Sequence, residues 1–185
     1  MGQSQSLNLR RIIFISLFTA LNIIGGYLSF PIPLSPLPIV LTDFFIMLAG
    51  LTMGASAAAA SVGLFLFLGA IGLPVFAGGA AGLAVFIGPK GGFLWGYLLC
   101  AWIAGLISSQ GKPSRFKDLA ALIGGNILLY APGAFWLKTV LKINWDKALV
   151  LSVYPFMIGM VIKIIAAIAL AQALRPLLKS EPDRK

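Results

Sequence analysis

Two side chains that are charged at neutral pH, one acid and one base, lie well inside apolar segments of this sequence, where a charge is costly. Lys163 lies in the run YPFMIGMVIKIIAAIALA, with no other charged residue within ten positions on either side. An ammonium group at the centre of a membrane costs about 2.5–3.5 kcal/mol on insertion scales, so it faces other protein elements and has a partner. Asp43 is the only acid within a predicted span, and we expect it to be that partner.

The depths of the two residues allow them to meet. Counted at 1.5 Å per residue, Asp43 lies about 7–8 Å below the outer membrane edge if the edge is at Pro38, and Lys163 about 12 Å below it if the edge is at Pro155. A lysine that reaches upward could contact the acid or a ligand held beside it. Two interpretations therefore stay open for each residue: a structural ion pair, or a polar contact to a ligand.

The stretch 74–97, PVFAGGAAGLAVFIGPKGGFLWGY, is too rich in glycine for an ordinary span and too apolar for an ordinary loop. It contains neither the GxxxxGK[ST] pattern nor the GxGxxG spacing of nucleotide-binding loops. Irregular backbone at membrane depth survives where it lines a cavity or is covered by protein, so we expect a non-helical insert at a ligand pocket. The residues expected there are Phe76, Gly78, Gly79, Ala80, Ala81 and Phe93. A re-entrant packing loop without a ligand is the alternative.

Two asparagines in apolar segments are weaker candidates. Asn126 lies in GGNILLY, and Asn22 lies in the first apolar segment. Asparagines within a membrane often form hydrogen bonds between helices, so this structural role is the main interpretation of both. A ligand contact is the alternative, and we include Asn126 among the candidate binding residues.

The composition indicates an integral membrane protein. The 185 residues are 59% hydrophobic and 10% charged, with a mean hydropathy of +0.99, whereas a soluble domain usually carries about 25% charged residues. The chain has no histidine and a single cysteine, Cys100, which removes imidazole metal sites, an internal disulfide and the commonest general base. We therefore expect neither a metal site nor catalysis. The basic residues cluster at the ends of apolar segments, so the net charge of +9 does not indicate nucleic-acid binding.

The hydropathy pattern predicts one all-α domain, 1–185, with six transmembrane helices in a single bundle and the glycine-rich insert as an extracellular loop between helices three and four. The predicted spans are approximately 12–30, 38–53, 55–71, 92–109, 119–140 and 154–174. Four prolines in PIPLSPLP (31–38) cannot continue a helix, so this segment is expected to be an extended turn.

Lysines and arginines predict the orientation of these spans. With six spans, the N-terminus, the connection 110–117 and the C-terminal tail share one side. That side holds nine basic residues: Arg10, Arg11, Lys112, Arg115, Lys117, Arg175, Lys179, Arg184 and Lys185. The opposite side holds four: Lys90, Lys138, Lys142 and Lys147. Because basic residues favour the cytoplasmic side, both termini are expected in the cytoplasm.

Small residues form two surfaces suited to close helix contacts. Ser16 and Ala20 lie four positions apart in the first span, and the segment from Gly54 through Ala58 to Ala60 opens the third. Such surfaces allow another membrane helix to approach closely. The spacing leaves open whether that helix belongs to this chain or to a partner protein.

Over nearly its whole length, the chain resembles the BioY family, the biotin-specific substrate-capture subunits (S components) of energy-coupling-factor (ECF) transporters. The resemblance rests on motifs in order. The first is the proline turn followed by PIVL (38–41), and the second is PVFAGGAAG followed by GPKGGFLWGY, which is similar to the family's GPTGGYL. Tyr130, Gly133 and Trp136 then fit the family's fifth helix. The last motif is PFMIGMVIK (155–163), which is similar to the family's PFxxGDxxK.

The resemblance implies a biotin site and identifies several differences within it. The family's lysine is kept as Lys163. At four other positions this chain differs from the family. Met160 stands where the family has an acid, and Lys90 stands where it has a threonine. The family often has an amide at the position of Thr42 and an asparagine near Ala80 or Ala81. Asp43, one residue beyond the amide position, is hypothesised to be a relocated acid that restores part of the polar network.

The expected function is high-affinity capture of biotin at the outer face of a bacterial-type cell membrane. Lipoate or dethiobiotin is the alternative cargo, because a pocket with Met160 in place of an acid suits a more apolar ligand. The resemblance implies a transmembrane scaffold (T component) and two cytoplasmic ATPases as partners, since this chain has no Walker motif. A channel or a proton-coupled transporter is a weaker alternative and should show two related halves. An intramembrane enzyme would need a nucleophile with a base, or a metal site.

Overall fold

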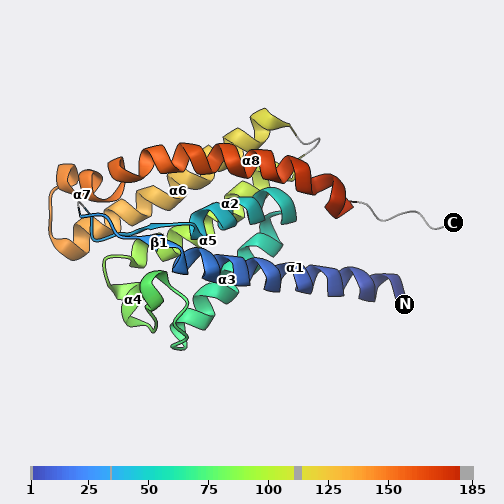
Figure 1. The fold of residues 1–185 in the computed structure, drawn as a ribbon, viewed down its shortest axis with the longest axis horizontal. Helices are drawn as coiled ribbons and strands as arrows, with labels where there is room; N and C mark the ends of the chain where they lie inside the picture. The colour runs from blue at the N-terminus through green and yellow to red at the C-terminus, as the bar shows by residue number, and fades with distance from the viewer. Residues whose placement is uncertain (1, 34, 111–113, 180–185) are drawn as a thin grey trace.

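The computed structural model describes residues 2–33, 35–110 and 114–179 as a bundle of helices (Figure 1). The longer helices are α1 (Gly2–Tyr27), α2 (Thr42–Met53), α3 (Ala55–Ala70), α5 (Gly91–Ser108), α6 (Arg115–Leu141) and α8 (Met157–Lys179). The connections contain α4 (Ala84–Ile87), α7 (Trp145–Ser152) and the 3-10 turns η1 (Ala77–Gly79) and η2 (Tyr154–Phe156). The predicted all-α class is confirmed.

Four stretches of the described chain are long and apolar enough to cross a membrane. They are Leu9–Tyr27, Gly91–Ser108, Arg115–Leu141 and Trp145–Pro176. Helices α2 and α3 are apolar too, but they have only 12 and 16 residues. At 1.5 Å per residue they measure about 18 and 24 Å, less than a hydrocarbon layer of about 30 Å. Neither helix is therefore long enough to cross that layer by itself.

The proline-rich connection forms a short hairpin. β1 (Ser29–Phe30) pairs antiparallel with β2 (Ile39–Val40). The predicted boundaries on either side were wrong as a result: the first helix ends at Tyr27 instead of 30, and the second begins at Thr42 instead of 38. Pro38 and the paired, extended β2 keep the chain out of helical conformation until Thr42.

The glycine-rich insert is not wholly non-helical, which corrects the prediction. Residues 77–79 form η1 and residues 84–87 form α4. Gly78, Gly79 and Gly82 adopt φ angles of +74°, +74° and +82°, which favour glycine over other residues. The helix expected to follow at Gly91 or Gly92 begins at Gly91 and ends at Ser108, one residue before the predicted end.

The segment between α6 and α8 contains a helix that the hydropathy pattern did not predict. α7 begins after Asn144, whose side chain accepts a hydrogen bond of 3.1 Å from the backbone N–H of Lys147. This N-cap stabilises the start of the helix. η2 then leads into α8, which begins at Met157. α7 lies at the same end of the molecule as β1 (Figure 1), and Ser35 Oγ donates a hydrogen bond to the carbonyl of Leu151 at 2.5 Å.

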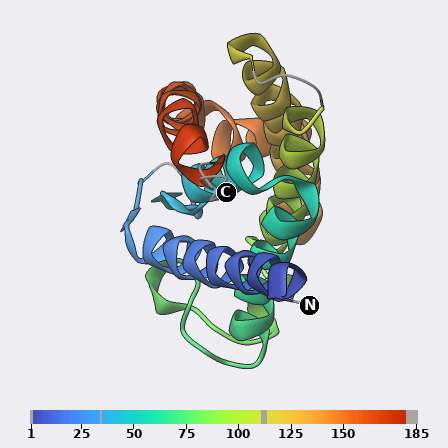
Figure 2. The same ribbon diagram turned by 90° about the vertical axis from the view of Figure 1, so that its right-hand side faces the viewer.

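α2 is the central helix of the bundle and packs against α1, α3, α5 and α8 (Figure 2). Eight of its twelve residues are buried. On the other side of the bundle, glycines bring α5 and α6 close together. A Cβ added at Gly96 would lie 2.7 Å from the carbonyl oxygen of Leu129, so only a glycine fits there. Cys100, on the same helix, faces the interior with no exposed surface.

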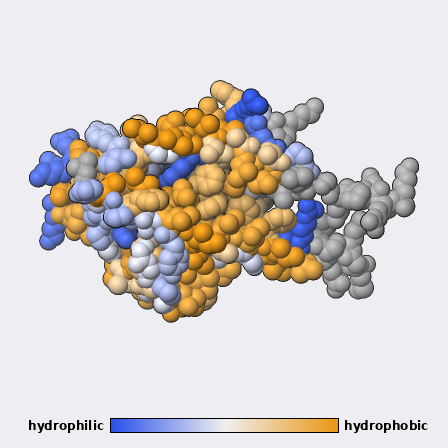
Figure 3. Space-filling view, in the orientation of Figure 1, coloured by the Kyte–Doolittle hydropathy of each residue, from blue (hydrophilic) through white to orange (hydrophobic). Residues whose placement is uncertain are grey.

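The surface is apolar across the middle and hydrophilic toward both ends (Figure 3). Isoleucines on α8, including Ile158 at 78% exposure and Ile165 at 64%, form part of this apolar surface. The start of α1 and the end of α8 lie at one end of the molecule, opposite α4, α7 and β1 (Figure 1). Of the basic residues used to predict orientation, Lys112, Arg184 and Lys185 lie outside the described residues.

Candidate ligand-binding site

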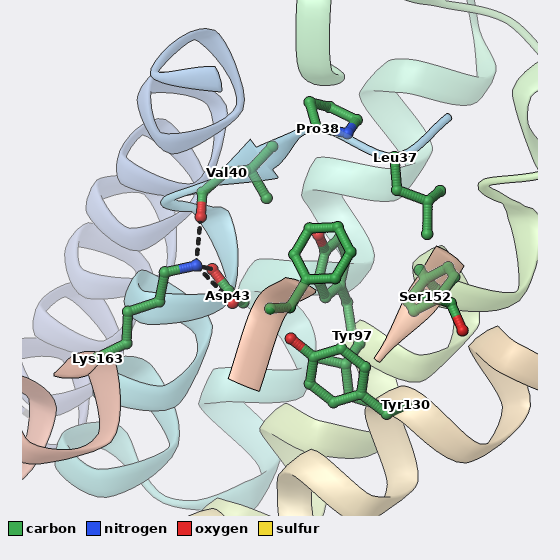
Figure 4. Close-up of a pocket in the computed structure, with 11 residues that line it drawn as sticks. Leu37, Pro38, Val40, Asp43, Tyr97, Tyr130, Ser152 and Lys163 are labelled. Carbon is green, nitrogen blue, oxygen red and sulfur yellow. Dashed lines mark hydrogen bonds and ion pairs between the residues drawn. The ribbon is translucent and has the colours of Figure 1, made fainter. Parts of the chain in front are cut away.

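Asp43 and Lys163 form a buried ion pair. Lys163 lies two turns into α8, and its Nζ is 2.8 and 2.9 Å from the two carboxylate oxygens of Asp43 in the first turn of α2 (Figure 4). The Lys163 side chain is 11% exposed and the Asp43 side chain is 7% exposed. The same Nζ donates to the carbonyl of Val40 in β2 at 2.6 Å. The pairing expected from the sequence is therefore formed.

The geometry explains how two charges can remain buried here. An ammonium group has three N–H donors, and Lys163 has three oxygen acceptors around it. Asp43 Oδ1 also accepts a bond of 3.1 Å from the backbone N–H of Phe44, and the carboxylate lies at the N-terminus of α2, where the helix dipole favours negative charge. The result is a neutral, well-bonded pair.

The pair lies at the wall of a cavity between α2, α5, α6 and α8. The empty space that these elements enclose, including the part open to solvent, is about 360 Å³. Its walls are formed by Leu37, Pro38, Val40, Asp43, Phe93, Tyr97, Leu129, Tyr130, Ser152, Phe156 and Lys163. This first cavity is mostly apolar, with the ion pair and a few hydroxyl groups as its polar features.

Two tyrosines supply hydroxyl groups to the first cavity. Among the residues that the structure describes, no partner forms a hydrogen bond with the hydroxyl of Tyr97 or Tyr130. In Figure 4 the Tyr130 hydroxyl points to the side of the cavity where Asp43 and Lys163 lie. The Ser152 hydroxyl, in contrast, already donates to the Ala148 carbonyl at 2.7 Å. The tyrosine hydroxyls are thus the groups most available to a ligand.

A second cavity adjoins the first and has an empty volume of about 490 Å³. Five residues line both cavities: Leu37, Pro38, Val40, Phe93 and Tyr97. The second cavity is also lined by Thr42, Phe65, Phe76, Ala77, Val85, Lys90 and Leu94. The shared residues place the two cavities side by side.

The structure brings part of the predicted site together. Asp43, Lys163 and Phe93 line the first cavity, and Thr42, Phe76 and Phe93 line the second. Thr42 donates its hydroxyl to the Asn22 carbonyl at 3.0 Å, and Phe76 is buried against Phe65 and Phe86. These five predicted residues come from four different elements of the chain.

The other predicted contacts do not line either cavity. In the glycine-rich insert, Gly78, Gly79, Ala80 and Ala81 turn back on themselves, and Ala77 lines the second cavity instead. The reason is local hydrogen bonding: the N–H of Phe76 bonds the Ala80 carbonyl at 3.1 Å, and the N–H of Gly79 bonds the Phe76 carbonyl at 2.9 Å. These backbone groups are therefore used within the turn.

Asn126 and Met160 are also displaced from the predicted site. The amide nitrogen of Asn126 donates to the Leu122 carbonyl at 2.8 Å and contacts the sulfur of Met47 at 3.2 Å, so it joins α6 to α2. Met160 packs against the core, while Phe156 of η2 lines the cavity. The geometry therefore supports the structural role of Asn126, a side-chain contact between two helices, over a contact with a ligand.

Sequence reasoning missed several cavity residues and could have found two of them. Tyr97 follows Phe93 by four residues on α5, a spacing that places side chains on one helix face, and Tyr130 is one of the residues on which the family resemblance rests. Leu37 and Pro38 had no such signal, because their place in the cavity depends on the conformation of the connection that carries them.

A second buried ion pair lies at the opposite end of the bundle. Arg175 of α8 binds both carboxylate oxygens of Asp118 in α6 at 2.7 Å, and Asp118 is 1% exposed. The same guanidinium donates to Ser108 Oγ at 2.7 Å and twice to the Leu51 carbonyl, at 2.8 and 3.0 Å. Arg175 therefore joins the ends of α2, α5 and α6 to α8.

The predicted partner-facing residues divide into two groups. Ser16 and Ala20 are exposed on α1, as a partner surface requires. Ala58 has no exposed surface, because its face of α3 packs into the chain's own core, so its assignment to a partner surface was wrong. Gly54 is half-buried at the turn between α2 and α3, with a φ angle of +76°.

Comparison with known proteins gives a consistent result. The sequence profile of the BioY family matches residues 1–180. The biotin transporter BioY of Thermotoga maritima is 36% identical over 169 residues, which cover 91% of this chain and 98% of that protein. The biotin transporter BioY of Rhizobium etli is 38% identical over 174 residues, with 89% and 92% coverage.

A solved structure agrees in fold over nearly the whole chain. It is the crystal structure of the S-component for biotin from an ECF-type ABC transporter, with a TM-score of 0.84, 33% sequence identity and 95% coverage of both chains. Together with the profile and the two relatives, it shows that this chain belongs to the BioY family.

Proposed function

We propose that this protein is the substrate-capture membrane subunit of an ECF-type ABC transporter and that it binds biotin for uptake. Its family and the names of its relatives support a transport role rather than an enzymatic one. The observation that carries the proposal is the pair of adjoining cavities, with a neutral ion pair at the wall of the first and aromatic side chains along the second.

The chemistry of the cavities suits the parts of biotin. Its ureido ring has two N–H donors and a carbonyl acceptor, which the Asp43 carboxylate and the free hydroxyls of Tyr97 and Tyr130 can satisfy. Lys163 holds Asp43 in place before the ligand arrives, so little ordering is needed on binding. Phe93 supplies an apolar wall for the sulfur-containing ring, and Phe76 supplies one for the aliphatic chain.

Lipoate is the alternative cargo, and one observation favours it. Apart from Lys90 and the hydroxyl-bearing Thr42 and Tyr97, the second cavity is lined by apolar residues, and Phe65, Phe76 and Phe93 are three of its walls. A dithiolane ring has no donors to satisfy and would tolerate such walls better than a ureido ring. Dethiobiotin keeps the ureido ring and would use Asp43 as biotin does.

The same proposal defines the membrane arrangement. Helices α2 and α3, with their flanking irregular segments, complete a bundle of six spanning units with the four longer stretches. The excess of basic residues at the end that carries both termini supports a cytoplasmic position for that end. The cavities, near β2 and the glycine-rich loop, then open toward the outer face of the cell membrane.

Transport requires partners in this proposal. The chain has no nucleotide-binding motif, so a transmembrane T component and two cytoplasmic ATPases would supply the energy. Ser16 and Ala20, exposed on α1, offer the small-residue surface on which a scaffold helix could pack closely.

Mass spectrometry of ligand retained by the purified protein tests the proposal. Biotin is the expected result, and lipoate or dethiobiotin would support the alternative cargoes. Recovery of a ligand that is not a carboxylic acid would overturn the assignment. As a second arm, Asp43→Asn should weaken biotin binding, because the amide replaces one acceptor oxygen with a donor. Unchanged affinity would remove Asp43 from the site.

A further inference from the structure

Lys90 differs from the other charged residues of the two cavities because its charge has no partner within the described structure. The charged residues that line the cavities are Asp43, Lys163 and Lys90. Asp43 and Lys163 neutralise each other at 2.8 Å. Lys90 forms neither a hydrogen bond nor an ion pair with any described residue through its side chain. Together, the two adjoining cavities therefore carry one uncompensated positive charge.

The surroundings of Lys90 favour an anion. It is half-buried at the N-cap of α5, and Phe93 and Leu94 in the first turn of that helix line the same cavity. The N-terminus of a helix carries a partial positive charge, which adds to that of the ammonium group. The nearby walls include Phe65 and Phe76, and apolar surroundings screen a charge less than water does.

Lys163 is poorly placed to bind an anionic ligand, although it is the more deeply buried lysine. Its three donors are already directed at the carboxylate of Asp43 and the carbonyl of Val40. A ligand carboxylate beside it would also meet the negative charge of Asp43, and like charges at short range repel each other. A ligand carboxylate is therefore attracted more strongly to Lys90 than to Lys163.

We propose that Lys90 determines the preference for a carboxylic acid by binding the carboxylate of the ligand in the second cavity. The neutral polar ring then lies in the first cavity beside Asp43, Tyr97 and Tyr130, and the aliphatic chain crosses the shared wall at Phe93. This inference rests on the proposed function and assigns the two ends of the ligand to the two cavities.

A comparison of two ligands tests the role of Lys90. Biotin and biotinol share the same ring and chain, but biotinol carries an uncharged alcohol in place of the carboxylate. The purified wild-type protein should prefer biotin over biotinol. Lys90→Met should lower the affinity for biotin by a factor of about 10–100, the size expected for a charged hydrogen bond, and should leave biotinol binding nearly unchanged. Lys90→Arg should retain the preference.

Two control variants separate this effect from general changes. Lys147→Met removes a positive charge from exposed α7, outside both cavities, and should bind both ligands as the wild type does. A double variant, Asp43→Asn with Lys163→Met, removes both charges of the buried pair together. The double variant should lower the affinities for biotin and biotinol to a similar extent and keep the preference for biotin.

The outcomes distinguish the two levels of the proposal. If the wild type binds biotin but Lys90→Met keeps the same ratio of biotin to biotinol affinity, Lys90 is not the carboxylate contact, and the proposed function stands. The same conclusion follows if only the double variant of Asp43 and Lys163 loses the preference for biotin over biotinol, since Lys163 would then bind the carboxylate. If the wild type binds neither ligand nor lipoate, both the function and the role of Lys90 are wrong.

Discussion

Arg175→Met should destabilise the protein more than any surface substitution, because it leaves a buried carboxylate without its partner. The guanidinium forms five hydrogen bonds, to Asp118, Ser108 and the carbonyl of Leu51. Removal of one member of a buried ion pair costs about 3–5 kcal/mol. For a chain of this size, a loss of that order lowers the unfolding midpoint by about 6–20 °C.

The chain contains its own reporter for this measurement. Cys100 is the only cysteine in the sequence, it is free, and it has no exposed surface in the folded protein. A thiol-reactive fluorophore therefore labels the protein only as it unfolds, and the labelling temperature gives the midpoint for each variant in detergent.

The matched control is Arg115→Met. Arg115 also joins α6 to α8 at the same end of the molecule, through a bond of 3.1 Å to Gln172, but this bond is exposed. Its loss should change stability by less than about 1 kcal/mol. A double variant, Arg175→Met with Asp118→Leu, should recover much of the loss, because no unpaired charge remains. If Arg175→Met shifts the midpoint no further than Arg115→Met does, the buried pair does not hold these helices together.

Two further predictions use the same preparations. Gly96→Ala should lower the midpoint, because its Cβ would lie 2.7 Å from the Leu129 carbonyl oxygen, an overlap that costs about 1–3 kcal/mol. Gly63→Ala, where a Cβ meets nothing within 4 Å, should raise stability by about 1 kcal/mol; equal shifts for the two glycines would contradict the packing of α5 on α6. Tyr130→Phe should leave the midpoint unchanged and weaken biotin binding by a factor of about 2–10, measured by calorimetry, since its hydroxyl has no partner among the described residues. A fall in stability with full binding would place that hydroxyl in the core instead.

The pairing of Asp43 with Lys163 was predictable from the sequence, and the reason is physical. Each was the single charge in a long apolar segment, and an unpaired charge in such a segment is too costly to persist. Arg175 and Asp118 form an equally buried pair that the sequence did not reveal. Both lie near the ends of apolar segments, where charges usually mark the membrane boundary, so the pattern concealed their contact.

The helices were predictable where length and hydropathy determine them, and the connections were not. α5 begins within the two residues that the pattern indicated, while α7 has only eight residues and is too short for hydropathy to identify as a separate helix. The inner structure of the glycine-rich loop depends on hydrogen bonds between Phe76, Gly79 and Ala80 that no periodicity encodes. For that reason Phe76 and Ala77 line the second cavity, whereas Gly78, Gly79, Ala80 and Ala81 line neither.

Titration of the purified protein with biotin tests the central claim most directly. The account predicts binding at a single site with micromolar or tighter affinity, together with a rise in the Cys100 labelling midpoint. At a ligand concentration 100 times the Kd, binding adds about 2.7 kcal/mol of stability. If millimolar biotin produces neither heat nor a shift in that midpoint, the joined cavities beside Asp43 and Lys163 are not a biotin site.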